Sequence, residues 1–276
     1  MGLNKAQSNE RYILYLDILG FSDLVESGES EKVYEMINKT LISCERWEKL
    51  NQSFSTIYFS DTIIFYQDCT GYYDWVFLDV YAIGALILSE LLANNIPARG
   101  AIGFGEFVVR DDESGKHQVY FGRALIDVYR AEKKENWIGI LILKSAWLPY
   151  EVRNPGIVKN FERERVWIKR NDDVLLLNPF RNLYDWYIYD IIGEIYCPYM
   201  ELDVPDFPNS IRGFMFLYNK VDEYKANGDF SSKVAMKYHS TITFLNQILG
   251  EDICEWCIRI YEEDKIQKNK IFKPDI

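Results

Sequence analysis

Apolar residues in the N-terminal half of the chain recur with two different periods. Residues 11–17 (RYILYLD) form an apolar, β-prone run that stops before Gly20, which predicts a buried strand ending at a turn. Residues 54–67 carry two β-rich runs that meet at a Ser-Asp pair, a pattern typical of a hairpin. Between them, over 33–44, apolar residues recur every three or four positions and predict an amphipathic helix.

The alternation of strand and helix patterns continues to residue 143. The pattern predicts a long apolar helix over 75–92, a strand over 97–110, a turn over 111–116, a return strand over 117–121, a helix over 122–135 and a strand over 138–143. This order predicts an α/β sandwich in which helices cover a mixed sheet. Beyond Pro149 the chain has a charged stretch, a β-like segment at 174–180 and helical patterns near 211–226 and 231–249. We therefore expect a core of residues 1–148 and a mostly helical C-terminal extension, residues 149–276, packed on it.

Composition and charge exclude several function classes. The 276 residues are 48% hydrophobic, and 42 acidic against 31 basic side chains give a net charge of -11. Such a charge argues against broad binding to nucleic acid or to an anionic membrane, although a small anion can still bind locally. The polar start lacks the apolar segment of a secretory signal, and we expect no stretch close to the roughly 20 uncharged apolar residues of a membrane span. The expected location is the cytoplasm.

The cysteines and histidines suggest no metal site of their own. Cys254 and Cys257 have CxxC spacing, but there is no second CxxC, and His117 and His239 are far away in the sequence. Packing of both thiols on one helix face is therefore the expected interpretation, with a zinc or redox site as the alternative.

Two aspartates occupy unusual positions. Asp17 ends an apolar strand, and Asp61 lies at the tip of the predicted hairpin. An ionised carboxylate there is costly to desolvate unless a cation compensates for it, and two such groups at adjacent strand ends suit Mg²⁺ or Mn²⁺. A turn or capping role for each aspartate is the alternative. After Asp17 in the sequence, residues Leu19, Gly20 and Phe21 lead into a predicted helix. The first backbone N–H groups of such a helix can bind phosphate oxygens.

At these residues the chain resembles the class III nucleotidyl cyclases. The matching segments are Asp17-Ile18-Leu19-Gly20-Phe21, Phe59-Ser60-Asp61-Thr62, the strand from Arg99 to Glu106 and the helix from Gly122 to Arg130. Together they span about residues 11–143. The resemblance implies a ferredoxin-like α+β catalytic core that cyclises a nucleoside triphosphate and releases pyrophosphate.

The resemblance also implies roles for particular residues. Asp17, Asp61 and the backbone carbonyl of Ile18 would bind two Mn²⁺ or Mg²⁺ ions in each active site. Arg130 would stabilise charge on the α-phosphate and would act in the partner's site, because active sites in this family lie at a homodimer interface. Ile126 stands where the family has an asparagine that positions the ribose.

The residues at the base-recognition positions depart from the purine-specific pattern. Ile57 and Val119 occupy the positions at which purine cyclases carry a polar pair, and both are apolar. Without hydrogen-bonding partners such a site loses purine discrimination. Tyr58, together with Tyr12, Tyr15 and Phe59, is expected either to narrow the pocket around a smaller ring or to form part of the core.

Together these features resemble the bacterial pyrimidine cyclases of the Pycsar antiphage system. That resemblance implies conversion of UTP to 3′,5′-cyclic UMP, a second messenger that activates a cell-killing effector protein. The alternatives are a cytidylate cyclase that uses CTP, an adenylate cyclase, and an inactive regulator that binds a nucleotide or a partner protein. Neither nucleic acid nor a membrane is an expected partner.

Overall fold

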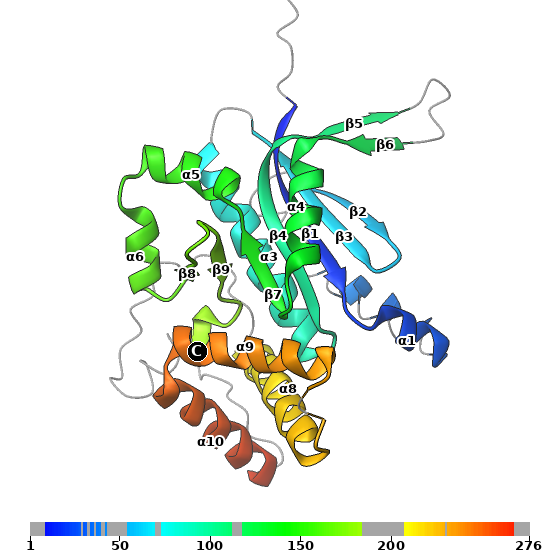
Figure 1. Cartoon of the computed structure of the whole chain (residues 1–276), viewed down its shortest axis with the longest axis vertical. Coiled ribbons are helices and arrows are strands. Elements are labelled where there is room, and N and C mark those ends of the chain that lie inside the picture. Colours follow the sequence, from blue (N-terminus) through cyan, green and yellow to red (C-terminus); the bar gives the residue numbers. More distant parts are fainter. Residues whose placement is uncertain are drawn as a thin grey trace, which may run out of the picture.

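A seven-stranded sheet with helices on both faces forms the centre of the protein (Figure 1). The structure is a computed structural model and describes residues 9–28, 30–31, 34–35, 37–39, 42, 54–69, 73–111, 118–183, 207–229 and 231–267.

The sheet has the strand order β2-β3-β1-β4-β7-β9-β8. Its strands are β1 (Glu10–Ile18), β2 (Ser55–Phe59), β3 (Thr62–Asp68), β4 (Ala98–Glu106), β7 (Gly139–Ile142), β8 (Trp167–Lys169) and β9 (Leu175–Leu177). Neighbouring strands are antiparallel except β4 and β7, which are parallel. A separate two-stranded ribbon consists of β5 (Val108–Asp111) and β6 (Gln118–Phe121).

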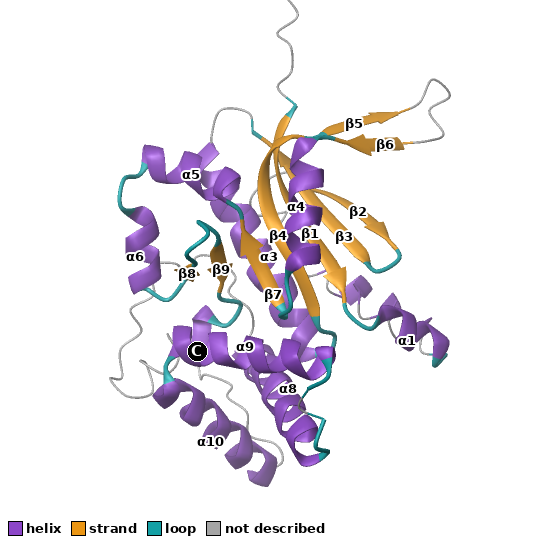
Figure 2. Ribbon diagram, in the orientation of Figure 1, coloured by secondary structure: helices purple, strands orange, loops and turns teal. Residues whose placement is uncertain are grey.

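Two helices cover opposite faces of this sheet, as Figure 2 shows. The described helices are α1 (Phe21–Glu26), α3 (Tyr73–Ala93), α4 (Arg123–Lys134), α5 (Lys144–Arg153), α6 (Ile157–Arg163), α8 (Phe207–Ala226), α9 (Lys233–Leu249) and α10 (Glu251–Gln267). Helix α4 packs on β1 and β4, while α3 packs on the other face and is itself covered by α8. Because side chains alternate along a strand, Tyr15 and Asp17 of β1 face α4, whereas Tyr12 faces α3.

The prediction of a mixed α/β fold is confirmed. The elements β1, α1, β2, β3, α3 and β4 follow the order of a ferredoxin-like unit. Gly122 lets α4 begin close to β4: its φ is +147°, and a Cβ atom there would lie 2.2 Å from the carbonyl oxygen of Glu106. The chain therefore returns from the ribbon directly onto the sheet.

Several sequence predictions need correction. The strand expected over 97–110 is split into β4 and β5, because Phe107 turns into the core and the chain leaves the sheet. Helices α5, α6 and α10 were not expected, and α5 continues through Pro149. Of the helix predicted over 33–44, residues 34–35, 37–39 and 42 are described and are helical, and the others lie outside the described residues. The division at residue 148 stays a prediction; it falls inside α5, and β9 and β8 extend the same sheet.

Helix α3 is the core helix of the fold. Within the described residues, one segment, Trp75–Ala93, is long and apolar enough to cross a membrane by length and composition, with a mean hydropathy of 2.0. Of its 18-residue window, 67% is buried against the sheet and α8, as in the core helix of a globular fold. The segment also contains two acidic residues, Asp79 and Glu90, so it is not an uncharged apolar run of that length.

Asp79 on α3 gives a prediction about stability. Burial raises the pKa of its carboxyl group from 3.8 to about 6. Because the pKa of Asp79 is higher in the folded than in the unfolded protein, protonation of this carboxyl group favours folding. This contribution to stability is complete below pH 3.8 and is lost as the pH rises through 6. We expect Asp79→Asn to be more stable than the wild type at pH 8 and to lose this pH dependence. Thermal unfolding between pH 4 and pH 8 measures both effects, and an unchanged pH profile in the variant would contradict the assignment.

The two CxxC thiols pack in the core. Cys254 and Cys257 are both buried on α10, and burial raises the pKa of each thiol, that of Cys254 to about 12. The packing interpretation is confirmed, because both thiols lie within the hydrophobic core. Cys44, Cys197 and His117 lie outside the described residues.

Candidate active site

The backbones of the two predicted ligand aspartates lie side by side. Asp17 is directly opposite Thr62 in the register of β1 and β3. The next residue, Ile18, donates a backbone hydrogen bond of 2.8 Å to the carbonyl oxygen of Asp61. Ser60, with φ +55°, closes the hairpin just before Asp61. Two acidic residues 44 positions apart in the sequence therefore meet at one end of the sheet.

The Asp17 carboxylate lies between two cations. Only 7% of the residue is exposed. One carboxylate oxygen, Oδ2, is 3.5 Å from Nη2 of Arg99, the residue directly opposite on β4. The other oxygen, Oδ1, is 3.6 Å from Nζ of Lys133 on α4. The two contacts compensate for the burial of this charge.

Arg99 holds Asp17 and the end of α4 together. Its Nε forms an ion pair with Glu132, its Nη1 donates a 3.0 Å hydrogen bond to the carbonyl oxygen of Glu135, and its Nη2 contacts Asp17. The Glu132 residue is 0% exposed. A single guanidinium group therefore fixes the last turn of α4 against the two central strands.

Electrostatic coupling extends through this cluster. Burial raises the pKa of Glu132, and the charge of Asp17 adds to that effect. Burial by itself lowers the pKa of the Lys133 ammonium group. The negative charges of Asp17 and Glu132 outweigh this effect, so the pKa of Lys133 is raised. Lys133 also lies 5.6 Å from the ring centroid of Tyr129, a cation–π distance.

The oxygen donors at this end of the sheet fit a hard divalent cation. Asp17, Asp61 and the carbonyl group of Ile18 supply carboxylate and carbonyl oxygens, the ligand types that Mg²⁺ and Mn²⁺ prefer. Within the described residues there is no cluster of three or more His, Cys, Asp or Glu side chains. The remaining ligands would have to be water or substrate phosphate, which is the usual arrangement for Mg²⁺ at nucleotide sites.

Ile57 faces the same side of the sheet as Asp17. It lies opposite Ile64, which in turn lies opposite Tyr15. By the same register, Tyr58 lies on the α3 face. Tyr12 is fully buried on that face, and its hydroxyl group donates to the carbonyl oxygen of Ala146 at 3.3 Å. Tyr12 thus belongs to the core.

The other predicted site residues are more dispersed. Arg130 is exposed on α4, and Ile126, one turn earlier on the same helix, is 44% exposed. Val119 is 50% exposed on β6, in the ribbon rather than in the main sheet that holds Ile57. Leu19 and Gly20 connect β1 to α1, which begins at Phe21. The roles given to these residues stay predictions.

Glu132, Lys133 and Lys237 were not among the site residues predicted from the sequence. A signal for Glu132 was present, since it continues the buried face of α4 formed by Ala124 and Val128 at intervals of four. An acidic residue on such a face requires a buried cation. No such signal pointed to Lys237, because its place depends on how α9 packs.

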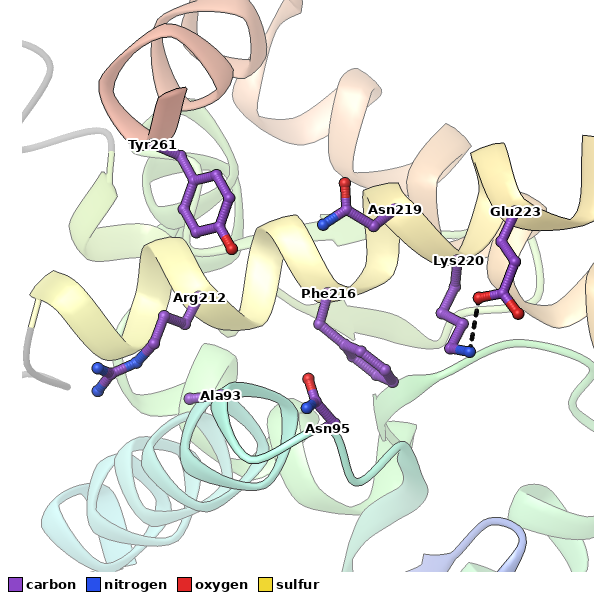
Figure 3. A pocket seen from close by; sticks show the side chains of 8 residues that line it. All are labelled: Ala93, Asn95, Arg212, Phe216, Asn219, Lys220, Glu223 and Tyr261. Carbon is purple, nitrogen blue, oxygen red and sulfur yellow. Dashed lines mark hydrogen bonds and ion pairs between the residues drawn. The ribbon is translucent and has the colours of Figure 1, made fainter. Parts of the chain in front are cut away.

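A pocket of about 260 Å³, whose lining includes none of these residues, lies between the end of α3, α8 and α10 (Figure 3). Its charged lining groups already have partners. Lys220 and Glu223 form an ion pair of 2.7 Å, and Arg212 hydrogen-bonds to Asn209. We assign no ligand to this pocket.

Comparison with known proteins shows that this chain is similar to several solved structures. Scans against models of protein families and against curated proteins found no match. The adenylyl cyclase CyaB from P. aeruginosa is 14% identical, with a TM-score of 0.48, over 61% of this chain and 93% of that one. The monomeric guanylyl cyclase domain of the RhoGC fusion protein from the aquatic fungus Blastocladiella emersonii is 11% identical, with a TM-score of 0.47, over 62% and 95%. The guanylyl cyclase Cya2 is 18% identical, with a TM-score of 0.43, over 61% and 89%. The cyclase activities in these names are those of the matched proteins.

Proposed function

We propose that this protein is a nucleotide cyclase that converts UTP into 3′,5′-cyclic UMP and pyrophosphate. The observation that carries the proposal is the convergence of Asp17 and Asp61. Each lies in a sequence motif that resembles a metal-binding motif of class III cyclases, and the 2.8 Å bond between Ile18 N–H and the carbonyl oxygen of Asp61 joins the two motifs. A turn or capping role for each aspartate would not require this convergence.

Asp17, Asp61 and the Ile18 carbonyl group would hold two Mn²⁺ or Mg²⁺ ions. When bound, such ions lower the pKa of a coordinated hydroxyl group and neutralise phosphate charge. In the reaction the ribose 3′-hydroxyl gives its proton to solvent water, its oxygen bonds to the α-phosphorus, and the bond to the pyrophosphate leaving group breaks. The chain's own contribution is positional: Arg99 contacts one carboxylate oxygen of Asp17, and the backbone hydrogen bond from Ile18 holds the hairpin turn that carries Asp61.

Arg130 would act across a homodimer interface on the α-phosphate in the partner's site. Its exposure supports this role, because an arginine serving the partner's site must project from its own fold. Apolar side chains are exposed on the same helix, Ile126 and Tyr129, and elsewhere on Phe121 of β6 and on Phe59 at the hairpin tip. Exposed apolar side chains are often covered in an assembly.

The apolar Ile57 supports a pyrimidine substrate over a purine. It faces the same side of the sheet as Asp17 and offers no hydrogen bond to a purine edge. UTP is the first choice and CTP the alternative, since uracil and cytosine differ mainly at position 4. The product would serve as a second messenger in antiphage defence and activate a cell-killing effector.

Incubation of the protein with each of the four nucleoside triphosphates and Mn²⁺ tests the proposal. We expect cyclic UMP and pyrophosphate in equal amounts, identified by mass spectrometry. Formation of cyclic CMP would instead identify a cytidylate cyclase, and formation of cyclic AMP an adenylate cyclase. Thermal stabilisation by a triphosphate and Mn²⁺ without turnover would favour the inactive regulator.

Mixing two inactive variants tests the shared active site. We expect Asp61→Ala and Arg130→Ala each to be inactive alone. In a mixed dimer one site combines an intact Asp61 with an intact Arg130, so random mixing should restore about a quarter of wild-type activity. The measurement is cyclic nucleotide formation after subunit exchange. No recovery, with mixed dimers demonstrated by mass spectrometry, would contradict the role of Arg130 in the partner's site.

A further inference from the structure

Helix α9 of the C-terminal region is fixed against the connection between α4 and β7. The hydroxyl oxygen of Thr241, which is buried, accepts a hydrogen bond of 2.8 Å from the backbone N–H of Ile138. The rings of Trp137 and Phe244 meet edge to face at 5.0 Å. In Figure 1, α9 crosses the end of the sheet at which α4 ends and β7 begins.

Lys237 lies on the same face of α9 as Thr241. The two residues are one helical turn apart, and the Thr241 hydroxyl group also lies 2.8 Å from the carbonyl oxygen of Lys237. Ile138, the partner of Thr241, precedes Gly139, which is opposite Arg99 in the sheet. The face of α9 that carries Lys237 and Thr241 therefore packs on the segment that leads into the strand residue opposite Arg99.

The charges around Lys237 are those of the candidate active site. Burial lowers the pKa of its ammonium group, and the charges acting on it are those of Arg99, Asp17, Glu132 and Lys133. Among the described residues, no carboxylate forms an ion pair with Lys237. Arg99 and Lys133 both contact the Asp17 carboxylate, whereas Lys237 has no such contact.

The three cations differ in how freely they can meet a ligand. Each outer nitrogen of Arg99 already has a protein partner, and its side chain is 13% exposed. The side chain of Lys133 is 42% exposed and contacts Asp17 at 3.6 Å, longer than a charge-assisted hydrogen bond. Lys237 is half-buried. The two lysines are therefore the groups available to an incoming anion.

We propose that Lys237 and Lys133 form an anion subsite beside Asp17 that binds the polyphosphate of a nucleoside triphosphate or the released pyrophosphate. The inference rests on the proposed function and extends it, because it gives the C-terminal region a direct part in substrate binding. A polyphosphate matches the site, since adjacent phosphoryl groups carry several negative charges that two neighbouring lysines can contact together.

Calorimetric titration of the full chain with inorganic pyrophosphate, in the presence of EDTA, tests the subsite without turnover. We expect Lys237→Gln to weaken pyrophosphate binding about tenfold, the effect of removing one charged contact. Lys237→Arg keeps the charge and should restore most of the affinity. Lys159→Gln, an equal charge change at an exposed site on α6, should leave it unchanged. Inorganic phosphate, with one phosphoryl group, should bind more weakly than pyrophosphate.

Kinetics provide a second measurement. With the triphosphate substrate, Lys237→Gln should raise KM about tenfold with little change in kcat, because the contact is made before and during the reaction alike. The subsite would be overturned if Lys237→Gln and the wild type bound pyrophosphate with equal affinity, or if the wild type did not bind it. Neither result would contradict the cyclase activity. Absence of any cyclic nucleotide, with pyrophosphate binding that depends on Lys237, would instead overturn the cyclase proposal and leave the subsite in place.

Discussion

We expect the Asp61→Ala protein to lose at least about 1,000-fold in the rate of cyclic nucleotide formation, because a catalytic metal ion contributes several kcal/mol to the reaction. Asp61 is half-buried, and its link to β1 is a backbone hydrogen bond that alanine preserves. The melting temperature should therefore stay within about 3 °C of the wild type. The measurement is the initial rate with UTP and Mn²⁺, alongside a thermal melt.

Two further variants make this result specific. Asp61→Asn keeps the size of the side chain and removes its charge, so it should be nearly as inactive as Asp61→Ala. Asp23→Asn removes an exposed carboxylate of nearby α1 and should leave the rate unchanged. Substantial activity in Asp61→Asn, or an equal loss in Asp23→Asn, would contradict the role of Asp61 as a metal ligand.

The largest expected effect on stability belongs to Glu132→Ala. Glu132 is fully buried and pairs with Arg99, so its removal leaves a buried guanidinium group without its main partner. We expect the free energy of unfolding to fall by about 3–5 kcal/mol, as for other broken buried ion pairs. Urea unfolding followed by circular dichroism measures this change.

Asp127→Ala on the same helix is the matched control. Asp127 pairs with Arg123 at 2.9 Å, but the two side chains are 37% and 71% exposed. Exposed pairs of this kind contribute little to stability, so the urea midpoint should move only slightly. Similar shifts in the two variants would show that Arg99 does not depend on Glu132.

The sequence predicted the part of the fold that local patterns determine. Strand β1, the hairpin of β2 and β3, and helices α3 and α4 follow from hydrophobic periods of two and of three to four residues. Helix α5 was missed because it continues through Pro149, a residue that normally ends a helix. The split between β4 and β5 depends on where Phe107 packs, which no local pattern encodes.

The candidate site was likewise predictable from the sequence only in part. Asp17 and Asp61 were identifiable because a carboxylate at the end of an apolar strand is unusual in itself. The contacts of Arg99 with Asp17, Glu132 and Glu135 arise from strand register and helix packing, which bring together residues up to 118 positions apart. Lys237 lies still further along the chain, and only the position of α9 relates it to Asp17.

Anomalous diffraction from crystals grown with Mn²⁺ and a non-reactive UTP analogue would locate the metal ions relative to both aspartates. Manganese peaks are expected about 2 Å from the carboxylate oxygens of both Asp17 and Asp61, with the phosphates of the analogue completing the coordination. A bound analogue whose manganese lies away from both carboxylates, with Asp17 still contacting only Arg99 and Lys133, would contradict this expectation.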